Sequence, residues 1–180
     1  DEIAAIPKLD PNAGQVRNIT KTQKGETVVI RKEVKNYEGK WVTLRNGTVS
    51  KKIVKMKDWS KVAVPFENGF PNFSRWTSAE LQLPEQLWFA SDDKQFTYLN
   101  KKLYLMTRRD PSLASRFTAG ELELLKNGKT PSRFTWHHHQ DKGKMELVDR
   151  YIHSKVGHTG GREIWGGGQK GRSGGLYYSD

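Results

Sequence analysis

The sequence predicts an α+β protein with three successive parts: an antiparallel, β-rich N-terminal part, a helical middle, and a C-terminal unit of two strands and a helix. Three observations support this prediction. Short β-branched segments alternate with turn residues up to about residue 83. Apolar residues then recur at helical spacing. Finally, all five histidines of the 180-residue chain lie between His137 and His158.

The composition describes a basic chain that fits one domain, or a small domain with an added lobe. Lys and Arg number 31 against 20 Asp and Glu, so the net charge is +11 and the pI is about 9.8. This charge favours a polyanionic partner such as nucleic acid or an anionic membrane surface, with mere solubility as the alternative. No apolar run approaches the roughly 18 residues of a membrane span. The absence of an initial Met suggests a fragment of a longer protein, with processing of the N-terminus as the alternative.

Cysteine is absent from the sequence. Disulfides and thiolate metal sites are therefore excluded, and any transition metal must be held by histidines and carboxylates.

The β-rich part begins after residues 1–25, which are expected to be a linker or a loosely attached arm because proline and glycine lie among scattered polar residues. Residues 26–83 predict an antiparallel meander. Asn46-Gly47 predicts a two-residue hairpin within it, because both central positions of a type I′ turn need positive φ. A further strand is expected at Ala79–Leu83. The meander strands are expected around Val28–Ile30, Trp41–Leu44, Val49–Val54 and Val62–Val64.

The helical middle contains two expected helices. Ser91 is placed to cap the first, which ends before Pro111. Thr118 and Glu121 have the spacing of a capping box at the start of the second, which ends before Gly128. The apolar residues that recur along the first helix, and that we expect in the core, are Phe96, Leu99, Leu103 and Met106.

The histidine-bearing segment predicts a strand, a turn, a second strand and a helix. Phe134–His139 is an extended aromatic run, and Met145–Val148 is the second strand. The helix is expected over Arg150–Val156, with Asp149 as its cap and Gly157 ending it in a left-handed conformation.

The histidines suggest a metal site, because three imidazoles that converge on one ion leave positions open for water and a substrate oxygen. Strand alternation places His137 and His139 on one face and His138 on the other, unless a bulge re-aims one of them. His158 lies five residues after His153, so it is expected beyond the helix end, where the chain can curl it back. A histidine that is not a ligand can take a proton from an attacking water. Metal capture without catalysis is the alternative.

Several of these residues resemble a known family. Trp136-His137-His138, Met145–Val148, His153 and His158–Gly161 together look like the Trp-His-His subgroup of the HNH/endonuclease VII nucleases. These nucleases are C-terminal toxin domains of bacterial contact-dependent growth inhibition systems and other polymorphic toxins. Phe66–Ser74 is similar to part of the same domains, so the resemblance covers residues 60–168.

The resemblance implies a nuclease domain at residues 60–180 with a ββα-metal (His-Me finger) core at residues 133–160. Residues 1–59 lie outside it and are either a delivery or cell-entry segment or an added sheet on the nuclease. Residues 166–175 form a glycine-rich stretch that is expected to be flexible, and either to order on substrate or to stay a tail.

The resemblance also implies residue roles in a metal-dependent DNA endonuclease toxin. His137, His153 and His158 are the expected ligands of one divalent metal ion (Zn²⁺, Mg²⁺, Mn²⁺, Ni²⁺ or Co²⁺), and His138 is the expected general base. His139 is either a ligand or a phosphate contact. An RNA-cleaving (tRNase) toxin and a noncatalytic metal-binding or nucleic-acid-binding module are the alternatives. No base-reading pattern is visible, so DNA cleavage is expected to be largely nonspecific.

Basic residues around the histidines are candidates for holding DNA phosphates. They are Arg133, Lys142, Lys144, Arg150, Lys155 and Arg162. A second basic group is either a DNA-backbone contact or a strand edge protected by charge. It consists of Lys51, Lys52, Lys55 and Lys57.

The resemblance further implies a partner and a setting. A cognate immunity protein, with an acidic surface that matches a basic DNA-binding face, is expected to block the toxin. The chain is expected to be a monomer when free of that protein. It is expected to be secreted or delivered from a cell surface as part of a larger toxin, and to act in the cytoplasm of the target bacterium.

Overall fold

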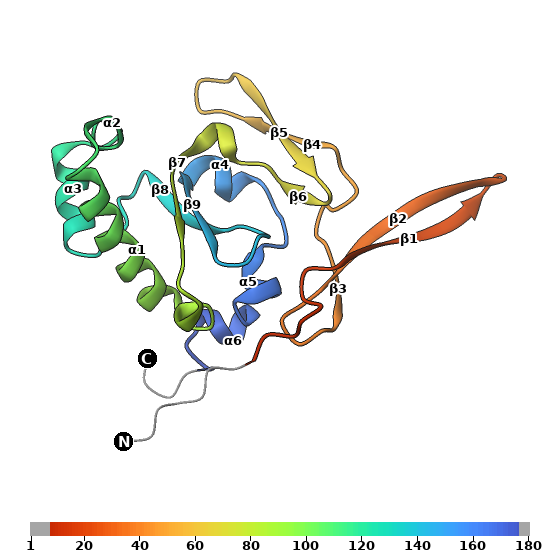
Figure 1. The fold of residues 1–180 in the computed structure, drawn as a ribbon. Coiled ribbons are helices and arrows are strands. Elements are labelled where there is room, and N and C mark those ends of the chain that lie inside the picture. Colours follow the sequence, from red (N-terminus) through yellow and green to blue (C-terminus); the bar gives the residue numbers. More distant parts are fainter. Residues whose placement is uncertain (1–7, 177–180) are drawn as a thin grey trace.

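The computed structural model describes residues 8–176 and shows a mixed α/β protein with antiparallel sheets and several helices (Figure 1). Three sheets of three strands each are present in this part of the chain. None of the helices in residues 8–176 is long and apolar enough to cross a membrane.

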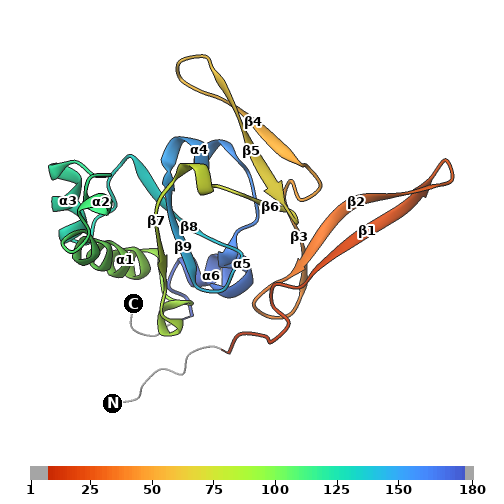
Figure 2. The same ribbon diagram turned by 45° about the horizontal axis from the view of Figure 1, so that its top comes forward.

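The first sheet has the order β1-β2-β3, with β1 at Val16–Gln23, β2 at Glu26–Lys35 and β3 at Trp41–Thr43. The β1–β2 hairpin projects away from the rest of the molecule in both views (Figures 1 and 2). The prediction of a linker over residues 1–25 is wrong for residues 16–23, which pair with β2 along their whole length. The strand forms through backbone pairing, and its exposed, mostly polar residues give no apolar alternation that would have indicated it. Residues 1–7 of the predicted arm lie outside the described residues.

The second sheet has the order β4-β5-β6, with β4 at Lys51–Lys55, β5 at Lys61–Glu67 and β6 at Phe70–Pro71. The predicted hairpin at Asn46-Gly47 is wrong, because the strands on its two sides, β3 and β4, belong to different sheets.

A turn does occur at Asn46, and its φ of 59° is positive. However, its side-chain amide donates a hydrogen bond of 2.7 Å to the carbonyl of Gly157. The turn is therefore tied to a distant segment, and the chain passes from one sheet to the next instead of folding back.

The third sheet has the order β7-β9-β8, with β7 at Thr77–Gln82, β8 at Phe134–His138 and β9 at Lys144–Asp149. Short 3₁₀ helices, η1 at Ser74–Trp76 and η2 at Glu85–Leu87, flank β7. The strand expected at residues 79–83 is thus confirmed, with a shift of two residues at its start and one at its end.

Helix α4, at Arg150–Lys155, follows β9 directly. Its predicted cap is confirmed, because the carboxylate of Asp149 accepts a hydrogen bond of 3.0 Å from the Ile152 amide. Gly157 does not adopt the predicted left-handed conformation. A Cβ at this position would collide with the guanidinium of Arg45, so close packing explains the glycine.

Helices α1 (Asp92–Thr107), α2 (Pro111–Ala114) and α3 (Ala119–Lys126) lie together on one side of the third sheet (Figure 1). Both predicted caps are confirmed, since Ser91 accepts from the Lys94 amide and Thr118 and Glu121 form a capping box. Of the four predicted core residues of α1, Leu99 and Leu103 are fully buried and Phe96 packs against the core. Met106 is exposed, contrary to the prediction.

The C-terminal stretch forms helices α5 (Gly161–Trp165) and α6 (Gly168–Arg172), so the prediction of a flexible tail is wrong over residues 166–172. Glycine serves close packing here, because a Cβ on Gly171 would collide with the carbonyl oxygen of Gly166. Trp165 is fully buried and anchors this stretch in the main core.

Two hydrophobic clusters hold the fold together. The main core joins Val34 and Leu44 of the first sheet and its adjoining turn to the third sheet and helices α1, α3 and α5. A second cluster lies between the second sheet and α4. Its buried members are Val54, Val64, Phe66, Phe73, Val148, Ile152 and Val156.

Candidate metal and nucleic-acid site

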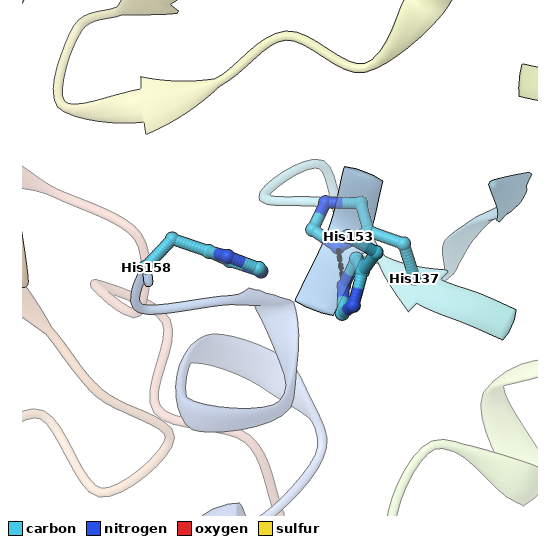
Figure 3. A group of neighbouring side chains, drawn as sticks. All are labelled: His137, His153 and His158. Carbon is cyan, nitrogen blue, oxygen red and sulfur yellow. Dashed lines mark hydrogen bonds between the residues drawn. The ribbon is translucent and has the colours of Figure 1, made fainter. Parts of the chain in front are cut away.

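Three histidines from three different segments of the chain lie close together. His137 lies near the end of β8, His153 lies in α4, and His158 lies in the segment after α4. The Nδ1 of His137 and the Nε2 of His153 are 3.2 Å apart, and the ring of His158 points toward them (Figure 3). One potential ligand atom from each of the three rings lies within 4.8 Å of the others. The predicted ligand set is thus brought together.

Phe73 forms an apolar side of this histidine group. Its ring is almost completely buried, and its centroid lies 5.0 Å, 5.3 Å and 5.6 Å from the ring centroids of His137, His153 and His158. Phe73 lies within the family-like stretch Phe66–Ser74, but the sequence did not predict that it would be part of the site. The histidines that Phe73 contacts follow it by 64 to 85 residues, so no local sequence pattern indicates these contacts.

The three imidazoles are held in the neutral form. Burial lowers the pKa of His137 well below its ordinary value, lowers that of His153 to about 3, and lowers that of His158. Each ring therefore carries one unprotonated nitrogen at neutral pH, which is the form that binds a metal ion.

Hydrogen bonding and spacing also suit a metal. The Nδ1 of His158 lies 2.7 Å from the carbonyl oxygen of Val156, which can only accept, so Nδ1 carries the proton and Nε2 is left unprotonated. Two nitrogens bound tetrahedrally to one ion at about 2.1 Å lie about 3.4 Å apart, close to the 3.2 Å between His137 and His153. The residues present therefore fit a divalent transition metal.

His138 points away from this group and contacts α1. Its Nε2 lies 2.8 Å from the side-chain oxygen of Gln95. The amide nitrogen of Gln95 donates to the carbonyls of Leu87 and Trp88 at 2.8 Å and 3.0 Å, which fixes the orientation of the amide. Because the Gln95 oxygen can only accept, Nε2 of His138 carries the proton and its Nδ1 is unprotonated. Burial, followed by the charge of Arg162, lowers the pKa of His138 well below its ordinary value.

His139 lies apart from the other four histidines. Its Nδ1 accepts a hydrogen bond of 2.9 Å from the Asp141 amide, and its ring lines a separate pocket with Glu80 and Glu146. The structure therefore does not bring His139 to the three-histidine group.

A cavity of about 520 Å³ connects the three-histidine group to His138. We call it the histidine cavity, since His137, His138, His153 and His158 all line it. Four cationic side chains also line it, together with the carboxylate of Asp92: Arg45, Lys155, Arg162 and Arg172. The mostly cationic lining suits an anionic group such as a phosphate.

Only two of the six predicted phosphate contacts line this cavity. They are Lys155 and Arg162, and Arg162 is itself buried, with its guanidinium donating to the Ala90 and Gly166 carbonyls and to Asp92.

The other four predicted phosphate contacts lie outside the cavity. The guanidinium of Arg133 lies 2.8 Å from a carboxylate oxygen of Glu121, and the ammonium of Lys144 lies 3.6 Å from a carboxylate oxygen of Glu80. Arg150 donates to a backbone carbonyl at 2.9 Å, and Lys142 is exposed in the turn after β8. The acidic partners and the carbonyl explain why Arg133, Lys144 and Arg150 point elsewhere.

Three residues of the site were not predicted from the sequence: Arg45, Arg172 and Gln95. Arg45 lies in the turn after β3, where its backbone amide donates to the Thr159 hydroxyl at 3.0 Å, so it reaches the cavity through a contact 114 residues away. Arg172 lies in the glycine-rich stretch that was expected to be a tail. Only the folded chain places these residues beside the histidines.

A comparison with known families identifies this region. The sequence model of a family described as the DNase/tRNase domain of colicin-like bacteriocins matches residues 64–160. The matched span includes all five histidines and covers more than half of the chain. No curated protein sequence matches the chain. The chain therefore belongs to the family of DNase/tRNase domains of colicin-like bacteriocins, and residues 64–160 form a nuclease toxin domain.

Proposed function

We propose that the chain is a metal-dependent DNA endonuclease of the HNH type, within the Trp-His-His subgroup, that acts as an antibacterial toxin. One observation carries the proposal: three neutral histidines converge in a mostly cationic cavity, and a fourth, His138, lines the same cavity. The direct succession of β8, β9 and α4 supports a ββα-metal core at residues 133–160.

In this proposal His137, His153 and His158 hold one divalent metal ion. When bound, the ion supplies a Lewis acid that neutralises charge on the scissile phosphate and on the leaving oxygen. Three imidazoles bind Zn²⁺, Ni²⁺ or Co²⁺ more tightly than Mg²⁺ or Mn²⁺. Mg²⁺ or Mn²⁺ is the alternative where it is the more available ion in the cell.

His138 is the proposed general base. Its unprotonated Nδ1 accepts a proton from the attacking water, and the Gln95 hydrogen bond keeps the proton on Nε2 so that Nδ1 stays available. Arg45, Lys155 and Arg172 hold the flanking phosphates. Because these cations address the sugar–phosphate backbone and not base edges, we propose that cleavage is largely independent of sequence.

The Gln95→Leu variant tests how His138 is positioned. Leucine has a similar size but cannot accept from Nε2, so the His138 ring should populate both tautomers and cleavage should fall at least about tenfold. Nitrogen-15 NMR of the His138 ring should show the mixture directly. Gln140→Leu, in the turn between β8 and β9, is the matched control. An unchanged tautomer in Gln95→Leu would remove this residue from the mechanism.

The proposed reaction is tested with supercoiled plasmid DNA and, separately, with tRNA. We expect nicking of the plasmid with an added divalent metal and none with EDTA. Cleavage of tRNA alone would favour the second candidate, an RNA-cleaving toxin, which the DNase/tRNase description of the family supports. Cleavage of neither substrate with any metal would leave a noncatalytic binding module.

We further propose how the domain is used. Residues 60–180 form the nuclease domain, and residues 1–59 are an added sheet on it, which the shared main core supports. The domain is delivered as part of a larger secreted or surface-bound toxin and acts in the cytoplasm of the target bacterium. Free of its partner it is a monomer, and an immunity protein with an acidic surface blocks the histidine cavity in the producing cell.

A further inference from the structure

A second basic surface lies outside the histidine cavity. We call residues 51–61 the lysine arm, which comprises β4, the turn after it and the start of β5. The arm contains five lysines and a single acidic residue, Asp58. The carboxylate of Asp58 is used within the turn, where it accepts a hydrogen bond of 3.0 Å from the Ser60 amide. The hairpin projects from the body on the side of α4 in both views (Figures 1 and 2).

Trp59, in the turn of the arm, is placed where it contributes little to stability. Its side chain is among the most exposed large apolar groups, at 75% of its full accessibility. Its φ of 72° lies in the left-handed region, which is unfavourable for a bulky residue. Strain and exposure together indicate a side chain displayed for contact with another molecule.

The arm is joined firmly to the helix that carries His153. The hydroxyl of Tyr151, on α4, donates a hydrogen bond of 2.6 Å to the carbonyl of Lys55. The ammonium groups of Lys57 and Lys155 lie 5.4 Å and 5.3 Å from the centre of the Tyr151 ring. Lys155 lines both the histidine cavity and a second pocket of about 460 Å³ beneath the arm. A continuous basic surface thus runs from the histidine cavity to Trp59.

We infer that the lysine arm binds the sugar–phosphate backbone of the DNA on one side of the scissile bond, with the lysines on phosphates and Trp59 against a sugar or base. The inference rests on the proposed DNase function and extends it to a second part of the surface. Lysine–phosphate contacts supply affinity without reading sequence, and an aromatic face stacks on any base.

Charge and residue type favour DNA over a protein partner. Protein–protein interfaces are depleted of lysine in their buried centres, whereas protein–DNA interfaces are strongly positive. Lys55 also lies over the Trp59 ring, with its ammonium 3.9 Å from the ring centre, which brings a cation and a stacking surface together. A nucleotide offers a partner for each, since its phosphate pairs with the cation and its base stacks on the ring.

Equilibrium binding of a short fluorescent duplex to the whole chain tests the inference. The Lys55→Gln/Lys57→Gln variant should bind roughly 30-fold more weakly at 0.15 M salt, and the slope of log affinity against log salt should fall by about 1.8, which corresponds to two lost phosphate contacts. The Trp59→Ala variant should bind the duplex about 5-fold or more weakly. Thermal unfolding should show that the variants remain folded, since all three side chains are exposed.

The matched control is Lys21→Gln/Lys24→Gln, which removes the same charge from the tip of the β1–β2 hairpin. This control should change the affinity for DNA less than about twofold, because direct lysine–phosphate contacts, and not the net charge of the chain, determine the loss of affinity. Equal losses in the two double variants would overturn the inference. Unchanged binding in the arm variants would also overturn it and would leave the arm as a surface for an acidic protein.

Binding is measured in EDTA, so it requires neither metal nor hydrolysis. A failure of the proposed nuclease function would appear as absent plasmid cleavage, whereas a failure of this inference would appear only in the binding of the arm variants.

Discussion

The His138→Ala variant should bind a divalent metal as tightly as the unaltered chain and cleave plasmid DNA about 10² to 10⁴ times more slowly. The ring of His138 points away from the three-histidine group and bonds to Gln95, so its removal leaves the proposed ligands in place. What is lost is the nitrogen that takes the proton from water. Isothermal calorimetry with the metal and plasmid nicking on the same samples would measure the two effects.

His139→Ala is the matched control for this variant. The two histidines are neighbours in sequence, but His139 lines a different pocket and its Nδ1 already accepts from a backbone amide. Its replacement should leave the cleavage rate within about threefold of the original, below the smallest effect expected of a general base. Full cleavage by His138→Ala, or equal losses in both variants, would contradict the assignment of His138 as the base.

The His153→Ala variant should lose metal affinity by more than about 100-fold. Loss of an outer partner of a ligand costs 10-fold to 100-fold in affinity, and loss of a ligand itself costs at least as much. Cleavage should fall with the bound metal and recover in part when the metal concentration is raised. Calorimetry at neutral pH, where the low pKa of His153 leaves its ring neutral in the original chain, gives the clearest comparison.

Ser154→Ala provides the control on the same helix. The hydroxyl of Ser154 donates to the Tyr151 carbonyl at 2.7 Å and lies one position from the proposed ligand. Its loss tests whether any change in α4 disturbs the site. Unaltered metal affinity in His153→Ala would exclude this residue from the ligand set, while the other two histidines would need separate tests.

Features that depend on neighbours in sequence could be predicted from the sequence. The caps at Ser91, Thr118 and Asp149 were found because each side chain bonds an amide three residues later. The opposite directions of His137 and His138 followed from the two-residue period of a strand. The histidine unit was predictable for the same reason, since its strands and helix are consecutive.

Features that depend on distant partners could not be predicted. The turn at Asn46 has only one of the two positive φ angles of a type I′ hairpin turn, because Gly47 lacks the other. The side-chain amide of Asn46 instead donates to the carbonyl of Gly157, 111 residues later, and the chain enters another sheet. The composition of the glycine-rich stretch predicts a flexible tail. In the structure its glycines instead allow α6 to pack closely against the end of α5. Arg45 gives no signal at all, because its role depends on a contact with Thr159. In each case tertiary packing overrides the local preference.

The three converging histidines and the arginine-bearing wall of the histidine cavity differ in the sequence separation of the parts that form them. The three converging histidines fall within 22 consecutive residues, so bringing them together closes only short loops and costs little chain entropy. The wall that contains Arg45 needs loops of more than 100 residues to close. During folding, the imidazoles can therefore gather early, whereas the wall can form only late, when nearly the whole chain is in place. A partly folded chain can gather the imidazoles before it has the complete charged surface that a polyanion requires.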